Sequence, residues 1–132
     1  MTDTPEARKA QMASQFSSLA PEYDAAGCFQ YFGKRLVDVA GVEPGHRVLD
    51  VASGRGAVLF PAAEHVGPGG HAAGIDLAEG MVQAANEDAA RLGHEPVRAA
   101  LAEHLEQYRQ SDGYHVPATA LIGTATRQAQ IG

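Results

Sequence analysis

The strongest constraint on this chain is a glycine-containing turn between an apolar run and a helix-like stretch. Residues 48–51 (VLDV) are mostly apolar, residues 52–56 (ASGRG) are small apart from one arginine, and residues 57–63 are again apolar. Glycine has no Cβ and adopts positive φ readily, so such a turn lets a ligand approach the backbone closely. The N–H groups that begin the following helix have no partner within it and face the same place. The pattern therefore predicts a strand, a tight turn and a helix start that together can hold a ligand.

A second strand-like run, residues 71–76, ends in the carboxylate of Asp76. Asp76 follows the turn by about 20 residues, the spacing at which a nucleotide-binding βαβ unit places the acid that binds ribose. The dinucleotide fingerprint needs three glycines, G-x-G-x-x-G. Here Gly54 and Gly56 are present and the third glycine is missing, which disfavours NAD or FAD. The same residues are also compatible with a purely structural connection between a strand and a helix.

Apolar periodicity predicts the order of elements along the rest of the chain. Helical spacing marks residues 5–19, 28–40, about 56–65 and 79–92, and strand-like runs mark residues 46–51, 71–76 and 116–126. A short strand is expected at residues 95–99, then a helix of about three turns through Leu101, Leu105 and Tyr108, and a turn at residues 111–113. This order places the glycine turn between the first strand and the helix that follows it.

Two of these segments carry expectations about burial. The helix expected at residues 28–40 has an apolar stripe, typical of a face that packs against a core. The stripe consists of Phe29, Phe32, Leu36 and Val39. The strand at residues 48–51 is expected to be buried on both faces, as strands of parallel sheets usually are. Cys28 is interpreted as a small buried hydrophobe.

Composition narrows the classes of partner and the compartment. The chain has 132 residues, which fits one domain, and a net charge of −6 without tryptophan, which disfavours a nucleic-acid surface. No apolar run approaches the roughly 20 residues of a membrane helix, and residues 1–16 have no apolar signal core. The single cysteine fits a reducing cytoplasm, and the six histidines show no metal-site spacing. We therefore expect a cytoplasmic protein without a metal, a membrane or a nucleic-acid partner.

Residues 48–93 closely resemble the class I S-adenosylmethionine-dependent methyltransferases in the length and order of their motifs. The resemblance implies that the glycine turn lies under the methionine part of S-adenosyl-L-methionine and that the strand-end acid binds its ribose. Residues 16–24 (FSSLAPEYD) resemble the segment that covers the cofactor in small-molecule and ubiquinone-type members. The cofactor-binding residues so implied are Tyr23, Asp50, Ala52, Gly54, Gly56, Asp76, Leu77 and Met81. Asp50 would orient the glycine turn by accepting its N–H groups, and Leu77 and Met81 would pack near the adenine.

The resemblance stops near residue 98 and resumes at the family's C-terminus, where a helix leads into an antiparallel last strand. It implies an α/β, Rossmann-like methyltransferase fold that lacks its middle and substrate half, with a mostly parallel sheet and a last antiparallel strand. We expect an N-terminal helical arm or lid over residues 1–27, a cofactor-binding βαβ core over residues 28–98, and a C-terminal helix and strand over residues 99–132. The first strand then has an open edge, which the final strand or a second copy in a homodimer would cover.

Two functions follow from the resemblance and remain open on the sequence alone. The first is an enzyme that transfers a methyl group from S-adenosyl-L-methionine to a small molecule. Its catalysis needs little from side chains, because the sulfonium is already activated and alignment of the reacting atoms supplies much of the rate. The sequence identifies no catalytic base. The second is a non-catalytic binding or interaction protein of the same family, or a truncated remnant of one.

Overall fold

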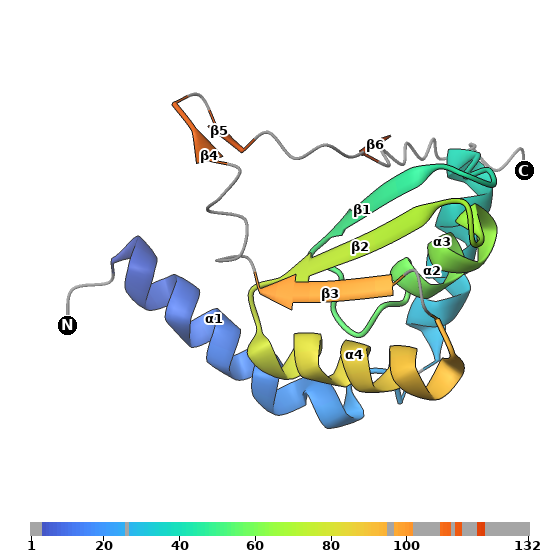
Figure 1. The fold of residues 1–132 in the computed structure, drawn as a ribbon. Helices are drawn as coiled ribbons and strands as arrows, with labels where there is room; N and C mark the ends of the chain where they lie inside the picture. The colour runs from blue at the N-terminus through green and yellow to red at the C-terminus, as the bar shows by residue number, and fades with distance from the viewer. Residues whose placement is uncertain are drawn as a thin grey trace, which may run out of the picture.

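The computed structural model describes residues 4–25, 27–94, 97–101, 109–111, 113–114 and 119–120. Its helices are α1 (Pro5–Leu19), the short 3-10 helix η1 (Ala20–Glu22), α2 (Cys28–Ala40), α3 (Leu59–Val66) and α4 (Glu79–Leu92). Its strands are β1 (Arg47–Val51), β2 (His71–Asp76), β3 (Val97–Leu101), β4 (Arg109–Gln110), β5 (Gly113–Tyr114) and β6 (Thr119–Ala120). Four strands form one sheet in the order β3-β2-β1-β6, and β4 and β5 form a separate antiparallel pair (Figure 1).

The first three strands of the sheet run parallel, with the two intervening helices packed against it. Val48 of β1 lies opposite Ala72 of β2, and both are buried beneath α3 together with Leu59. Gly74 is required here, because a Cβ at that position would lie 2.7 Å from the Leu59 side chain. The expected α/β, Rossmann-like arrangement of strand, turn, helix and strand is confirmed. The bounds of β2 and α4 coincide with the predicted ranges 71–76 and 79–92.

The opposite face of β1 is exposed, so the expectation that this strand is buried on both faces is wrong. Along β1 the buried Val48 is followed by half-buried residues, and Val51 is 67% exposed. The packing helices α3 and α4 explain the difference, since they follow β1 and β2 in right-handed crossovers and therefore cover the same face of the sheet. In Figure 1 both helices lie on the same side of the strands.

The last described strand runs parallel to β1, and the antiparallel direction expected for it is a wrong prediction. Thr119 pairs with Val48 and Ala120 with Leu49. Residues 102–118 connect β3 to β6, and this connection is longer than the dozen or so residues that a parallel crossover needs. The final strand thus covers part of the edge of β1 within one copy of the chain. The rest of the predicted range 116–126 lies outside the described residues.

The region around residue 101 also differs from the prediction. Leu101, expected to begin a helix, is the last residue of β3 and pairs with Asp76. Leu105 and Tyr108 lie outside the described residues. The turn predicted at residues 111–113 is confirmed at Ser111, which connects the antiparallel strands β4 and β5.

Helix α2 presents a different face to the core from the one its apolar stripe predicts. Its buried residues are Gly33 and Val37, whereas Phe32 is 64% and Val39 is 61% exposed. The reason is the close approach of Gly33 to the carbonyl group of Ala57, a position that any Cβ would overlap. Close backbone contact turns the glycine side of α2 inward and its aromatic side outward. Cys28 is exposed, which also corrects its expected burial.

Helix α3 begins at Leu59, three residues later than expected, because residues 54–58 form turns. Pro61 lies in the first turn of the helix, where its missing N–H costs no hydrogen bond. Within the described residues, no helix has both the length and the apolar composition that crossing a membrane requires.

Candidate functional site

The turn between β1 and α3 adopts the left-handed backbone that its composition predicts. Gly54 has φ +53° and Gly56 has φ +98°. Ala52 has φ +60° and is the one non-glycine residue with positive φ among the described residues. The left-handed region costs an L-residue with a Cβ roughly 1–2 kcal/mol. The fold therefore maintains a strained alanine at the end of β1, next to the two glycines.

Asp76 fastens this turn to the end of β2. Its Oδ2 atom accepts a hydrogen bond of 2.8 Å from the N–H of Gly54, and its Oδ1 atom accepts one of 2.8 Å from the N–H of Ala78. An ionised carboxylate has about four acceptor positions. Asp76 therefore retains the capacity to accept hydrogen bonds from a ligand while it holds the turn.

A cavity of about 270 Å³ lies beside Asp76 and the glycine turn. Small-molecule sites usually have volumes of roughly 300–1,000 Å³, so this cavity lies near the lower limit. Six of the eight predicted cofactor-binding residues line it, namely Tyr23, Ala52, Gly54, Asp76, Leu77 and Met81. Its remaining lining residues are Met12, Ala13, Phe16 and Ala78. The structure thus combines an acid, a backbone turn and apolar walls around one small space.

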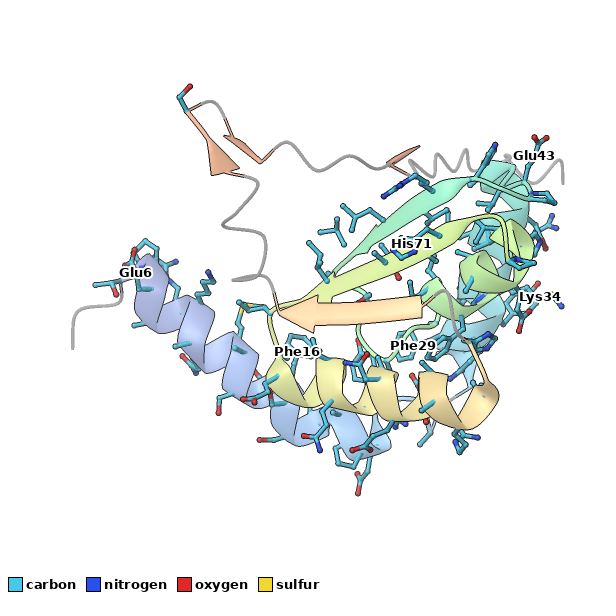
Figure 2. All side chains as sticks on the ribbon, viewed as in Figure 1. Glu6, Phe16, Phe29, Lys34, Glu43 and His71 are labelled. Carbon is cyan, nitrogen blue, oxygen red and sulfur yellow. The ribbon has the colours of Figure 1, made fainter. Side chains whose placement is uncertain are left out.

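The N-terminal arm, defined here as α1 with η1 and Tyr23, supplies one wall of this cavity. Phe16 and Tyr23 pack edge to face with ring centroids 6.2 Å apart, and Tyr23 stacks on Phe29 at 4.9 Å. Figure 2 shows Phe16 between α1 and α4. The ring of Tyr23 thus packs on aromatic neighbours and also lines the cavity, and its contact with a cofactor stays a prediction.

Two predicted cofactor residues lie outside the lining of this cavity. Gly56 lines a second cavity, described below. Asp50 is half-buried and accepts a hydrogen bond from the backbone N–H of Leu59, while its Oδ2 atom is buried without a hydrogen-bond partner. The bond to the turn that was expected from Asp50 is made instead by Asp76 to Gly54. Asp50 thus lies beneath the start of α3.

The environment of Asp50 changes its acidity. Burial and the nearby negative charge of Asp76 raise the pKa of Asp50 from 3.8 to about 6, although the Leu59 N–H opposes the shift. A carboxylate with its pKa this close to neutrality responds strongly to any charge placed beside it. A cationic ligand near Asp50 would favour the ionised form of its carboxyl group.

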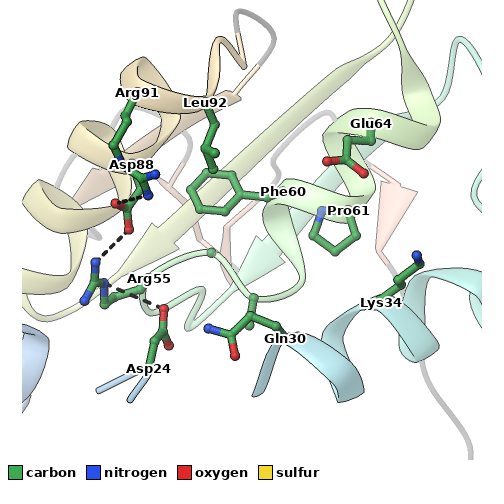
Figure 3. Close-up of a pocket in the computed structure, with 12 residues that line it drawn as sticks. Asp24, Gln30, Lys34, Arg55, Phe60, Pro61, Glu64, Asp88, Arg91 and Leu92 are labelled. Carbon is green, nitrogen blue, oxygen red and sulfur yellow. Dashed lines mark hydrogen bonds and ion pairs between the residues drawn. The ribbon is translucent and has the colours of Figure 1, made fainter. Parts of the chain in front are cut away.

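The second cavity has a volume of about 330 Å³ and lies on the other side of the turn (Figure 3). Its lining includes the charged residues Arg55, Asp88 and Arg91 and the apolar residues Phe60 and Leu92. The structure places the guanidinium of Arg55 2.7 Å from Asp88 on α4, with 18% of the side chain exposed. No sequence signal indicates this pair, because 33 residues separate its members.

Comparison with known proteins identifies the family. A family described as "Methyltransferase domain" matches residues 42–115, more than half of the chain. Nocamycin O-methyltransferase from Saccharothrix syringae is 54% identical over 80 residues, which is 59% of this chain and 29% of that protein. Aklanonic acid methyltransferase DauC from Streptomyces sp. (strain C5) is 45% identical over 87 residues, which is 64% of this chain and 40% of that protein.

A solved structure supports the fold. A crystal structure described as a SAM dependent methyltransferase from Aquifex aeolicus superposes with a TM-score of 0.53 and 28% identity, covering 70% of this chain and 48% of that one. The chain therefore spans less than half the length of each of these relatives. The match across β1, the glycine turn, α3, β2 and α4 establishes that the chain belongs to the methyltransferase-domain family.

Proposed function

We propose that this chain binds S-adenosyl-L-methionine in the cavity beside Asp76 and contributes to methyl transfer to a small-molecule acceptor. The observation that carries the proposal is the convergence of six predicted cofactor-binding residues, distant in the sequence, on one space of about 270 Å³. The names of the two relatives, which state nocamycin and aklanonic acid as their substrates, support a small-molecule acceptor.

The residues present fit the cofactor in chemical terms. Asp76 would accept hydrogen bonds from the ribose hydroxyls, because its carboxylate has acceptor positions left beside Gly54 and Ala78. Leu77 and Met81 offer apolar surface for the adenine, and Ala52 and Gly54 would lie against the methionine part. The bound cofactor supplies an activated methyl group, and the chain's contribution is to hold it in a fixed orientation.

The second candidate function is binding of the cofactor without methyl transfer. The matched segment represents 29% and 40% of the lengths of the two relatives. The residues described around the cavity serve cofactor binding, and the acceptor site is not assigned to any of them. Both candidates require the same cavity. We also propose a homodimer, in which a second copy would pair with the edge of β1 beyond Val48 and Leu49, the two residues that β6 pairs with in the described part of the chain.

The experiment that tests the proposal is calorimetric titration with S-adenosylhomocysteine of the wild-type chain, Asp76→Ala and the control Glu79→Gln. Glu79 is an exposed acid in the first turn of α4 and does not line the cavity. Loss of the ribose acceptor should weaken binding roughly tenfold to a hundredfold, from about 1–3 kcal/mol, with no change in the control. Absence of binding by the wild-type chain, or equal affinity in Asp76→Ala, would refute the assignment.

A further inference from the structure

Among the described residues, the N-terminal arm contacts α4 near the C-terminal end of α1. None of the residues of α1 is buried. At its C-terminal end, Ser17 Oγ accepts a hydrogen bond of 3.1 Å from the N–H of Gly80, and Ala20 is buried against Ala78 and Met81. An element with so little buried apolar surface belongs to the part of a protein that opens most readily. Each polar contact that holds the arm is therefore expected to reduce how often it opens.

Arg55 supplies two of these contacts from inside the glycine turn. Its Nη1 atom donates hydrogen bonds to the carbonyl oxygens of Ala20 at 3.0 Å and of Pro21 at 3.2 Å. Its Nη2 atom donates a 2.7 Å hydrogen bond to Asp88 Oδ2 on α4. One guanidinium thus joins the arm, the turn and α4, and Figure 3 shows it between the carboxylates of Asp88 and Asp24.

The charges around Arg55 keep it in place. The Nε atom faces Asp24 Oδ2 at 3.7 Å, and Asp88 is held in turn by Arg91 at 3.0 Å. Burial of Asp88 opposes its ionisation, but the hydrogen bonds from Arg55 and Arg91 outweigh this and lower the pKa of Asp88 below its usual value. The carboxylate is therefore charged at neutral pH, and the guanidinium fork has a fixed anionic anchor on α4.

We infer that Arg55 is a positioning residue that latches the N-terminal arm to the glycine turn and thereby holds Phe16 and Tyr23 over the cofactor cavity. The inference rests on the proposed function for the ligand and on the structure for the latch. Arg55 lies between Gly54, which lines the cofactor cavity, and Gly56, which lines the second one. The backbone of Arg55 is part of the turn and its side chain binds the arm. A movement of the turn is therefore transmitted to the arm, and a movement of the arm to the turn.

The test measures amide hydrogen exchange in residues 12–23 of the ligand-free chain and, separately, the affinity for S-adenosylhomocysteine. Arg55→Gln removes the charge and the fork, and Arg55→Lys retains a charge for Asp88 but replaces the planar five-donor guanidinium with a compact ammonium group on a shorter side chain. Both variants should exchange residues 12–23 roughly tenfold or more faster than the wild-type chain, the effect expected when charge-assisted hydrogen bonds are lost, while β2 and α3 keep their protection. If Arg55→Gln fails to fold, Arg55→Lys alone decides the question.

The matched control is Arg91→Gln, because Arg91 also binds Asp88 but is exposed, and among the described residues it makes no hydrogen bond to the arm. Its exchange in residues 12–23 should equal that of the wild-type chain. Unchanged arm exchange in both Arg55 variants, or an equal rise in Arg91→Gln, would overturn the latch. Exchange in the ligand-free chain does not involve the cofactor, so this result is independent of whether the proposed function survives. Where the cofactor binds, the Arg55 variants should also release it faster than the control does.

Discussion

Replacement of Asp50 by asparagine should change how the stability of the fold depends on pH. Burial and the charge of Asp76 raise the pKa of Asp50 to about 6 in the folded chain, against 3.8 as the reference value. Between these two values the folded state binds more protons than the unfolded state does. The free energy of unfolding therefore falls as pH rises from about 4 to about 6, and levels off above the folded pKa.

The magnitude follows from the pKa difference of about two units between the two states. At 1.36 kcal/mol per unit, the wild-type chain should lose about 3 kcal/mol of stability through Asp50 in total, from pH values well below 3.8 to pH values well above 6. Asp50→Asn removes the titration and retains an oxygen that can accept the N–H of Leu59. Any fixed cost of the new amide group is the same at every pH. The stability of the variant relative to wild type should therefore rise by about 2 kcal/mol between pH 4 and pH 7, since the remainder of the total is lost below pH 4.

Urea denaturation followed by circular dichroism at pH 4, 5, 6 and 7 measures this difference. Glu87→Gln is the control, because Glu87 is an exposed carboxylate on α4 that makes the same acid-to-amide change. Its stability relative to wild type should vary little over the range. A pH-independent difference for Asp50→Asn, or one that falls as pH rises, would show that Asp50 is not held in an environment that disfavours its charge.

Two further substitutions test the backbone of the site. Ala52→Gly should raise the free energy of unfolding by about 1 kcal/mol, because it relieves the left-handed backbone of Ala52, and a lower stability in urea denaturation would contradict that strain. Gly74→Ala should lower the melting temperature, with a cost of about 1–3 kcal/mol, because its Cβ would lie 2.7 Å from Leu59 and from Ser53 Oγ; calorimetry showing an unchanged melting temperature would rule out the close packing of α3 on β2.

The sequence predicts those parts of the fold that depend on local pattern. The strand ending at Asp76 and the helix over residues 79–92 are confirmed because their signals are local. The strand has an apolar run, and the helix has helical spacing that ends at Gly93. Gly54 is similarly predictable, since its left-handed backbone is a local property of the turn. The six cavity residues were predicted only through the resemblance of residues 16–24 and 48–93 to the methyltransferase family.

Features set by contacts between distant segments were not predictable in this way. The orientation of α2 depends on how closely Gly33 approaches Ala57, and this contact outweighs the apolar stripe that includes Phe32. Asp76, and not Asp50, accepts the N–H of Gly54 because of how the ends of β1 and β2 lie relative to the turn. The pair of Arg55 with Asp88 depends on the packing of α4 beside the turn. None of these has a signal within a window of the sequence.

The most direct test of the cofactor site uses the methionines of the chain. There are three, at positions 1, 12 and 81, and both Met12 and Met81 line the cavity beside Asp76. Two-dimensional NMR of the chain labelled with ¹³C in its methionine methyl groups would be recorded during titration with S-adenosylhomocysteine. We predict saturable shifts of the Met12 and Met81 signals with a single dissociation constant. Saturable binding that leaves both the Met12 and the Met81 signals unmoved, or no change in any signal, would contradict the proposed site.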